Sequence, residues 1–336
     1  MIACYIIKPG FLELREVLKP EPAEGEVLVK IGAALTCGTD LKAFQRGHSL
    51  IPMPGPFGHE FSGTIEKVGK KVRRFKSGDE IMAVHTAPCL KCVYCAKKAF
   101  NLCENLMATK ILGAYAEYIL IPKHIVRQNL YHKPDSLSFE EAALLEPLSC
   151  VVHGIKKLKL KDSKTLIIGT GPIGLLHLML AKLKGSEVLI TGLEHERLKL
   201  AKKLGADMIV PPSGLDEAIK SFTGGVGMDL VFECTGQLDV WERSVNYVRR
   251  GGTIILFGGC RKDTIVTYDT YRLHYDEITI QGSFHFTPKD VKIAFGLLRD
   301  TLKVSSLISE RYPLKDIAKP FEKLSRSEGL KYAIIP

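Results

Sequence analysis

Short segments of alternating apolar and polar residues fill the N-terminal third of the chain. They are rich in β-branched and aromatic residues, are separated by Gly, Pro and Asp, and cover Val27–Ile31, Phe61–Val68, Glu80–Val84 and Glu117–Ile121. Runs of this length between turn-forming residues predict β-strands. We therefore expect the first part of the chain to be β-rich.

A helix is predicted to follow the β-rich segment. Ser138 and Glu141 fit a capping box, in which each side chain satisfies a backbone N–H of the other residue. The helix should therefore begin near Phe139, and we expect it to carry Glu146 toward its end.

The pattern changes after Lys164, where continuous apolar runs alternate with helical segments. The predicted strands are Thr165–Ile168, Val188–Ile190, Leu230–Glu233 and Thr253–Phe257, and the predicted helices between them are Pro172–Lys184 and His195–Leu204. Strands without polar alternation, joined by helices, indicate a parallel, doubly wound α/β sheet. A last helix is predicted over Pro288–Leu302, in a tail that returns to the first domain.

Length and charge narrow the class of protein. A chain of 336 residues favours two domains. Its 47 Lys and Arg are scattered among 37 Asp and Glu, so the formal net charge of +10 indicates a solvated surface rather than a nucleic-acid partner. The N-terminus has no secretory signal, and the apolar stretch Leu175–Leu183 is too short to span a membrane. We expect a cytoplasmic protein without a membrane partner.

Four of the nine cysteines lie close together in the sequence. Cys89, Cys92, Cys95 and Cys103 have the spacing C-x2-C-x2-C-x7-C, which suits a closed, structural Zn–S4 site. An iron–sulfur cluster and unligated thiols remain as alternatives. A zinc ribbon that binds nucleic acid is disfavoured, because the segment lacks a basic stripe and an aromatic platform. Two other cysteines, Cys4 and Cys150, are interpreted as packed thiols, as are Cys234 and Cys260.

A second candidate metal site combines different donors. Cys37 precedes Gly38-Thr39-Asp40, and His59 and Glu60 follow a proline-rich turn, while Glu146 is a further acidic candidate. One thiolate, one imidazole and one carboxylate suit a catalytic zinc with an open fourth position. Each residue is weak evidence when it is taken alone.

A glycine-rich segment predicts a dinucleotide-binding turn. The sequence G-x-G-x-x-G follows a predicted strand and opens a predicted helix, which puts a pyrophosphate at the helix N-terminus. The cofactor residues expected in this segment are Gly169, Gly171, Pro172, Ile173 and Gly174.

The choice between NAD and NADP depends on the end of the next strand. NAD-binding folds carry an acid there, but this chain has Gly192. Arg197 is able to pair with a 2′-phosphate, whereas Glu194 would bind ribose or repel phosphate. Both cofactors stay open, with a lean to NADP. Cys234, Thr235 and Gly258 end later strands and are expected to face the cofactor.

These motifs together resemble one protein family. Gly58-His59-Glu60-x2-Gly63-x5-Gly69-x2-Val72 is similar to the zinc signature of the medium-chain dehydrogenase/reductase superfamily, and the other motifs occur in family order. The resemblance implies that Cys37 and His59 bind zinc, with Glu60 or Glu146 as the acidic ligand, and that Thr39 relays the substrate proton. The family often continues this proton relay through a histidine three positions after the hydroxyl. This chain has Lys42 at that position, and His48 is expected either to replace the histidine or to contact the substrate.

The resemblance also implies a fold and a function. It predicts a GroES-like catalytic zinc-binding domain with a structural zinc lobe, residues 1–152 and 285–336, and a Rossmann dinucleotide-binding domain, residues 153–284. The expected reaction is hydride transfer between a secondary alcohol (a polyol, sugar alcohol or 3-hydroxy amino acid) and NAD(P), with two zinc ions per chain. An NADPH-dependent aldehyde or ketone reductase is the alternative. A small-molecule substrate and a homodimer or homotetramer are expected.

Overall fold

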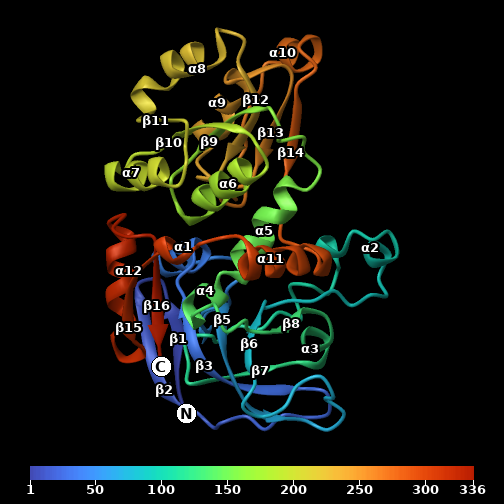
Figure 1. Ribbon diagram of the computed structural model, residues 1–336. Coiled ribbons are helices and arrows are strands. Elements are labelled where there is room, and N and C mark those ends of the chain that lie inside the picture. Colours follow the sequence, from blue (N-terminus) through green and yellow to red (C-terminus); the bar gives the residue numbers. More distant parts are fainter. The chain divides into compact units, whose positions relative to one another are not determined.

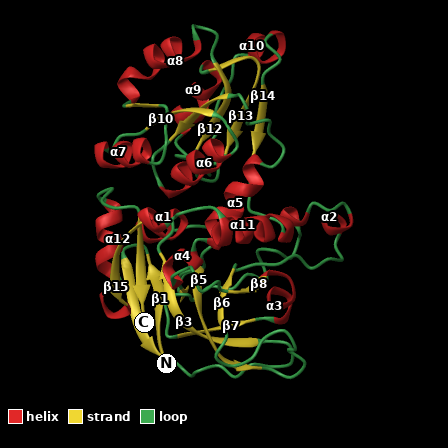
Figure 2. Ribbon diagram, in the orientation of Figure 1, coloured by secondary structure: helices red, strands yellow, loops and turns green.

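The chain divides into two compact units in a computed structural model that describes residues 1–336. Unit 1 comprises Met1–Cys150 and Phe286–Pro336, and unit 2 comprises Val151–His285. Figure 1 labels the elements, and Figure 2 shows that unit 1 is rich in strands, whereas helices flank the sheet of unit 2. The predicted fold class, a β-rich domain together with a doubly wound parallel sheet, is confirmed.

Unit 1 contains two sheets. The small sheet has the order β2-β1-β4, and the large sheet has the order β15-β16-β3-β5-β6-β8, with β7 paired to β3. The strands are β1 (Ile2–Lys8), β2 (Phe11–Glu16), β3 (Val27–Leu35), β4 (Gly55–Pro56), β5 (Glu60–Val68), β6 (Glu80–Ala83), β7 (Tyr118–Ile121), β8 (Leu130–His132), β15 (Ile308–Pro313) and β16 (Lys331–Ile335). The helices are α1 (Gly38–Arg46), α2 (Val93–Ala96), α3 (Lys123–Asn129), α4 (Phe139–Ala143), α11 (Pro288–Asp300) and α12 (Ala318–Ser325).

The pairing of β3 with β5 forms the centre of unit 1. The two strands are antiparallel, with Leu35 opposite Glu60. The C-terminal strand β16 adds to the other edge of β3, where Ala333 lies opposite Leu35. As a result, the last residues of the chain lie beside the end of β3 and the start of β5.

Unit 2 contains one six-stranded parallel sheet of order β11-β10-β9-β12-β13-β14. Its strands are β9 (Lys164–Ile168), β10 (Glu187–Thr191), β11 (Met208–Val210), β12 (Met228–Glu233), β13 (Val248–Leu256) and β14 (Thr279–Gly282), and its helices are α6 (Pro172–Leu183), α7 (His195–Lys203), α8 (Leu215–Thr223), α9 (Leu238–Arg243) and α10 (Thr270–Tyr275). The central strands are buried because helices cover both faces of such a sheet. No helix of the protein is long and apolar enough to cross a membrane.

The structure corrects the predicted position of Glu146. The helix that begins at Phe139 ends at Ala143, and a new helix, α5 (Leu145–Ile155), carries Glu146 in its first turn. Pro147 is the physical reason: it has no N–H to donate and fits a helix only in the first turn. The capping box of Ser138 and Glu141 is present as predicted.

Several elements were not predicted. The β1–β2 hairpin, α1, β14 and the C-terminal strands β15 and β16 have no assignment in the sequence analysis. Strand β2 has mostly exposed residues, so it lacks an apolar pattern. Strands β15 and β16 pair in parallel, and α12 lies between them in the sequence. Their formation depends on partners that are distant in the chain, so local periodicity does not show it.

A buried histidine in α6 gives unit 2 a pH dependence. His177 donates from Nδ1 to the Ile173 carbonyl at 2.9 Å, and its Nε2 is buried without a hydrogen-bond partner. The ring packs on Phe232 and Phe257, with both centroid distances 4.7 Å. Burial lowers the pKa of His177 to about 4.

We expect unit 2 to lose stability in acid because of His177. The pKa of His177 in the folded state lies below its value of about 6.5 in the unfolded chain, so acid favours the unfolded chain, which binds the proton more readily. The free energy of unfolding is therefore unaffected by His177 above about pH 6.5 and falls by about 3 kcal/mol as the pH drops to 4. Urea unfolding between pH 7.5 and 4.5 can be followed by Trp241, the single tryptophan, which lies in α9. His177→Leu should remove this part of the pH dependence. An unchanged pH profile in the variant would contradict the assignment.

Candidate metal and cofactor sites

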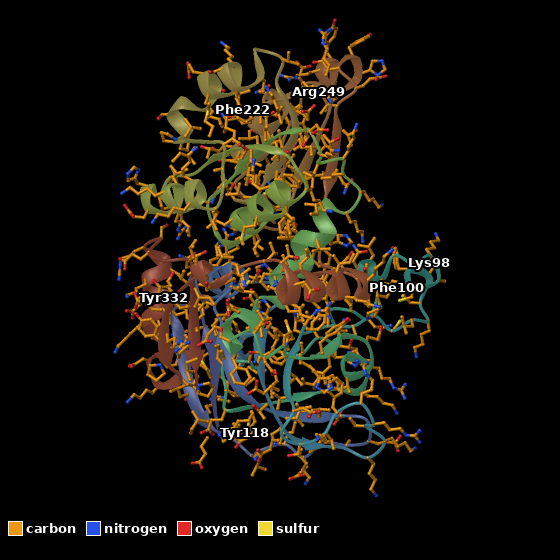
Figure 3. All side chains as sticks on the ribbon, viewed as in Figure 1. Lys98, Phe100, Tyr118, Phe222, Arg249 and Tyr332 are labelled. Atoms are coloured by element: carbon orange, nitrogen blue, oxygen red, sulfur yellow. The ribbon has the colours of Figure 1, made fainter.

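The four predicted lobe cysteines come together around one point. Cys92 precedes α2, Cys95 lies within it, and Cys103 follows the short turn that contains Phe100. All four sulfur atoms, those of Cys89, Cys92, Cys95 and Cys103, lie within 4.8 Å of one another. A tetrahedral zinc with Zn–S distances of about 2.3 Å needs sulfur–sulfur separations of about 3.8 Å, so the donor set fits one zinc ion. Figure 3 labels Lys98 and Phe100 on this lobe.

The lobe also shows how thiolates are stabilised. Hydrogen bonds from the Lys91 backbone and the Asn105 side chain lower the pKa of Cys89 to about 6. The opposite holds at Cys95, where burial raises the pKa of the thiol to about 12 and so favours the protonated form in the absence of metal. The Cys89 N–H also donates to the Cys103 sulfur at 3.3 Å. Backbone donors on thiolate sulfur are the surroundings that a metal-bound cysteine requires.

The second candidate metal site forms where β3 ends and β5 begins. Cys37 is the N-cap of α1 and accepts a hydrogen bond from the Thr39 N–H at 3.4 Å. Because Leu35 pairs with Glu60, the loop after β3 lies beside His59 and Glu60. The donor atoms of Cys37, His59 and Glu60 lie within 4.8 Å of one another. The structure therefore brings together a thiolate, an imidazole and a carboxylate.

Asp40 holds the ring of His59. The Nδ1 atom of His59 lies 3.1 Å from Oδ1 of Asp40, and the other carboxylate oxygen accepts a hydrogen bond from the Tyr115 hydroxyl at 2.7 Å. This contact leaves Nε2 as the atom able to bind a metal. Burial lowers the pKa of His59, but the charges of Asp40 and Cys37 outweigh it and raise that pKa well above its usual range.

Lys331 holds the carboxylate of Glu60. Its Nζ lies 2.8 Å from Oε1 and 2.5 Å from Oε2 of Glu60 and donates to the Thr36 carbonyl at 2.9 Å. The side chains of Lys331 and Glu60 are only 3% and 0% exposed. Burial lowers the pKa of Lys331, but the charges of Glu60, Cys37 and Glu146 and the hydrogen bonds to Glu60 together outweigh burial and raise that pKa. Tyr332, which Figure 3 labels, fixes the strand through its N–H and the Thr36 hydroxyl at 2.9 Å.

Glu146 lies beside the same cluster. Its Oε1 is 3.5 Å from Nδ1 of His85, whose ring centroid is 4.9 Å from that of His59. The Cys150 sulfur is 3.8 Å from the same carboxylate oxygen. Burial raises the pKa of Glu146 to about 7, although the charge of His59 opposes this. Glu60 and Glu146 are therefore both buried carboxylates near His59.

The cofactor glycines have distinct structural reasons. Gly169 has φ +114°, a conformation that other residues rarely adopt. A Cβ on Gly174 would lie 1.9 Å from the Gly169 carbonyl oxygen, whereas a Cβ on Gly171 would meet nothing within 4 Å. Pro172 begins α6, where its missing N–H costs nothing, and Ile173 follows it. The turn thus leaves open space at the N-terminus of α6, as a bound pyrophosphate requires.

The end of β10 has little room for an acidic side chain. A Cβ on Gly192 would lie 2.2 Å from the Thr170 hydroxyl oxygen. Arg197 and Glu194, which have opposite charges and are expected to have opposite effects on a 2′-phosphate, interact with each other, since Nη1 of Arg197 is 3.6 Å from Oε2 of Glu194. Both lie at the start of α7, one turn apart.

The loops after β12 and β13 are held by Glu233. The Glu233 carboxylate accepts hydrogen bonds from the Thr235 N–H at 2.6 Å, the Gly236 N–H at 3.1 Å and the Thr235 hydroxyl. A Cβ on Gly258 would lie 2.2 Å from the Gly236 nitrogen, so the two loops are in contact. Cys234 begins the loop after β12, where its N–H donates to the Ile168 carbonyl at 3.0 Å, and burial raises the pKa of its thiol well above the usual range.

Some residues of these sites have no role in the sequence predictions. Asp40, Lys331, His85 and Glu233 position others, yet each is an ordinary polar residue in the sequence. Asp40 and Glu233 had a local signal, because Asp40 lies within the motif after Cys37 and Glu233 ends the predicted strand before Cys234. Lys331 had none, since its partner Glu60 is 271 positions away.

Comparison with known proteins identifies similar chains. A family model described as "Zinc-binding dehydrogenase" matches residues 172–300, and one described as "Alcohol dehydrogenase GroES-like domain" matches residues 23–134. The chain is 34% identical to D-arabitol-phosphate dehydrogenase from Enterococcus avium (97% of this chain, 95% of the relative) and 31% identical to sorbitol dehydrogenase from Halalkalibacterium halodurans (97% and 96%). A solved structure from Sinorhizobium meliloti, described as a zinc-binding dehydrogenase bound to NADP, has a TM-score of 0.90 at 28% identity, covering 100% of this chain and 99% of that chain.

Proposed function

The chain belongs to the zinc-dependent medium-chain dehydrogenase/reductase superfamily, and on this premise we propose that it oxidises a polyol or sugar alcohol by hydride transfer to NAD(P). The observation that carries this proposal is the cluster of Cys37, His59 and Glu60. Both curated relatives are named for polyol substrates. Unit 1 is assigned the catalytic chemistry and unit 2 the dinucleotide, and a homodimer or homotetramer is expected from the similarity.

The donor chemistry of the cluster fits a catalytic zinc. Cys37, His59 and Glu60 are assigned as ligands, because catalytic zinc sites use three protein donors of these types. Asp40 and Lys331 are assigned as positioning residues, because metal-bound imidazoles and carboxylates have such hydrogen-bond partners. When bound, zinc supplies Lewis acidity at the alcohol oxygen, and NAD(P) supplies the hydride acceptor.

Thr39 is assigned the proton transfer. It lies two residues after Cys37 in the first turn of α1, and its side chain is partly buried. As the alcohol becomes a carbonyl, its carbon gives up a hydride to the nicotinamide and its oxygen gives up a proton to the Thr39 hydroxyl. The Thr39 hydroxyl releases its own proton toward the cofactor ribose and from there to solvent. Lys42 lies one turn after Thr39 in α1, at the position where the family often has the next residue of the proton relay.

The activity is tested by steady-state kinetics. Purified protein with zinc is assayed with sorbitol, D-arabitol and threonine in the presence of NAD+ or NADP+, and the absorbance of the reduced nicotinamide is followed. Turnover of polyols supports the proposal. Failure of these alcohols, and of the phosphate esters of the two polyols, to reduce either cofactor would overturn it.

We expect two zinc ions per chain, and each site has its own variant. Cys103→Ser should lower the zinc content from two to about one per chain by emptying the lobe, because zinc requires all four sulfur ligands. Glu60→Gln should also lower the zinc content, in this case by emptying the site of Cys37 and His59. Glu146→Gln should retain both zinc ions. Cys260→Ser is the matched control, with its cysteine outside both clusters. The measurement is elemental analysis after gel filtration, and zinc loss only in Glu146→Gln would reverse the choice of carboxylate.

Arg197 is proposed to favour NADP+ over NAD+. Gly192 leaves no carboxylate at the end of β10, and Arg197 offers a charge-assisted donor to the 2′-phosphate. Arg197→Leu is expected to raise the KM for NADP+ about tenfold with little change for NAD+. Glu194→Gln, which removes the competing carboxylate, should lower the KM for NADP+. Equal effects of Arg197→Leu on both cofactors would show that Arg197 has only a structural role.

A further inference from the structure

The helix that follows Cys37 carries basic side chains on the same face as Thr39. Lys42 and Arg46 lie three and seven positions after Thr39, a spacing that puts the three residues on one side of α1. Leu41 and Phe44 of this helix pack on the hydrophobic core of unit 1, and Asp40 and Ala43 are buried, so the row lies on the less buried side of α1. A row that begins at Thr39 therefore continues as two cations.

The acidic residue of α1 does not neutralise this row. Asp40 points inward, where its carboxylate contacts His59 at 3.1 Å and the Tyr115 hydroxyl at 2.7 Å. Arg46 is exposed at the end of the helix and takes part in no ion pair within the chain. Arg46 therefore contributes a positive charge without an ionic partner at the far end of this row.

His48 follows Arg46 by two residues and is partly buried. Its Nδ1 accepts a hydrogen bond from the Leu50 N–H at 3.2 Å, so in the neutral ring Nε2 carries the proton and is a donor. Burial lowers the pKa of His48, and the charges of Lys42 and Arg46 lower it further, while Asp40 raises it. His48 is therefore a neutral donor that follows the two cations in the sequence.

We propose that Lys42, Arg46 and His48 form an anion subsite for the substrate, and that this subsite binds the phosphate group of a phosphorylated polyol. The inference rests on the proposed function, since it places the phosphate beyond Thr39, away from the carbon that loses the hydride. Lysine and arginine are the residues that bind phosphate oxygens through charge-assisted hydrogen bonds, and a neutral histidine adds a donor.

The test compares free and phosphorylated polyols on the zinc-containing enzyme. D-arabitol and sorbitol are assayed against D-arabitol 1-phosphate and sorbitol 6-phosphate, and the readout is the ratio of kcat/KM for each phosphorylated polyol to that of its free form. We expect a ratio of about 100, because a phosphate bound by two cations gains several charge-assisted hydrogen bonds. Inorganic phosphate should inhibit D-arabitol oxidation competitively.

Variants separate the subsite from a general role of α1. The double variant Lys42→Met with Arg46→Met should bring the ratio close to one and weaken the inhibition by inorganic phosphate. A loss of proton relay through Lys42 would lower both kcat/KM values together and leave the ratio unchanged. Lys76→Met removes an exposed lysine elsewhere in unit 1 and should keep the wild-type ratio.

Two outcomes have different meanings. Turnover of free polyols with a ratio near one in the wild-type enzyme, or a ratio that survives the double variant, would overturn the subsite and leave the proposed function intact. No turnover of any free or phosphorylated polyol with either cofactor would overturn the proposed function and the subsite with it.

Discussion

Replacing Lys331 by methionine is expected to lower the free energy of unfolding of unit 1 by about 3–5 kcal/mol, because the variant leaves the Glu60 carboxylate buried without its partner. The lost contacts are those of Nζ with both Glu60 oxygens and with the Thr36 carbonyl, which join β16 to the start of β5 and the end of β3. We also expect zinc affinity at the Cys37 site to fall about 10- to 100-fold, as when other partners of metal ligands are removed.

Circular dichroism during denaturation and zinc content after dialysis against a chelator measure these two effects. Trp241 fluorescence follows unit 2 separately and should keep its wild-type transition. Lys19→Met is the matched control, because it breaks an exposed ion pair with Glu66 and should leave unfolding and zinc content unchanged.

A double variant distinguishes the buried charge from the packing of the lysine. Lys331→Met with Glu60→Leu should recover most of the lost stability, because a buried pair replaced by apolar residues leaves no unpaired charge. It should not recover the zinc, since the carboxylate is gone. Wild-type stability in Lys331→Met alone would show that the ion pair does not hold the strands together.

Gly174→Ala is expected to raise the KM for the cofactor about 100-fold and to lower the free energy of unfolding of unit 2 by about 3 kcal/mol. The added Cβ would lie 1.9 Å from the Gly169 carbonyl oxygen, which is backbone and has no rotamer to change. The N-terminus of α6 must therefore move away from the end of β9. The donors aimed at the pyrophosphate move with it.

Two other glycines separate stability from cofactor binding. At Gly171 the space is open and φ is −70°, so Gly171→Ala should keep wild-type stability yet raise the KM for the cofactor by blocking its approach. Gly282→Ala also meets nothing and should change neither quantity. Steady-state kinetics and Trp241 fluorescence during urea unfolding measure both effects. A Gly174→Ala enzyme with wild-type cofactor KM would show that the turn tolerates a shift.

Much of the fold is visible in local patterns. The strands of unit 2 are continuous apolar runs, and the capping box of Ser138 marks the start of α4, so both were predicted close to their observed positions. The division of the following segment into α4 and α5 was missed because helical periodicity continues across it, although Pro147 was a usable signal. Strands β15 and β16 were missed because their pairing requires β3, a strand from the other end of the chain.

The candidate sites follow the same distinction. Residue type and spacing suggested donors such as Cys37, His59 and the lobe cysteines, because few side chains bind zinc and their motifs are compact in sequence. The partners that hold these donors are common polar residues. Asp40 and Lys331 acquire a role only through what folding places beside them.

The sequence by itself determined the family, the two kinds of layer and the chemical types available at each site, since periodicity, glycine turns and metal-binding residues act over short stretches of chain. Only the tertiary structure decided which carboxylate lies with Cys37 and His59 and which lysine holds it. The physical reason is distance: hydrogen bonds and ion pairs act over a few ångströms, and the chain brings residues as far apart as Glu60 and Lys331 within that range only by folding.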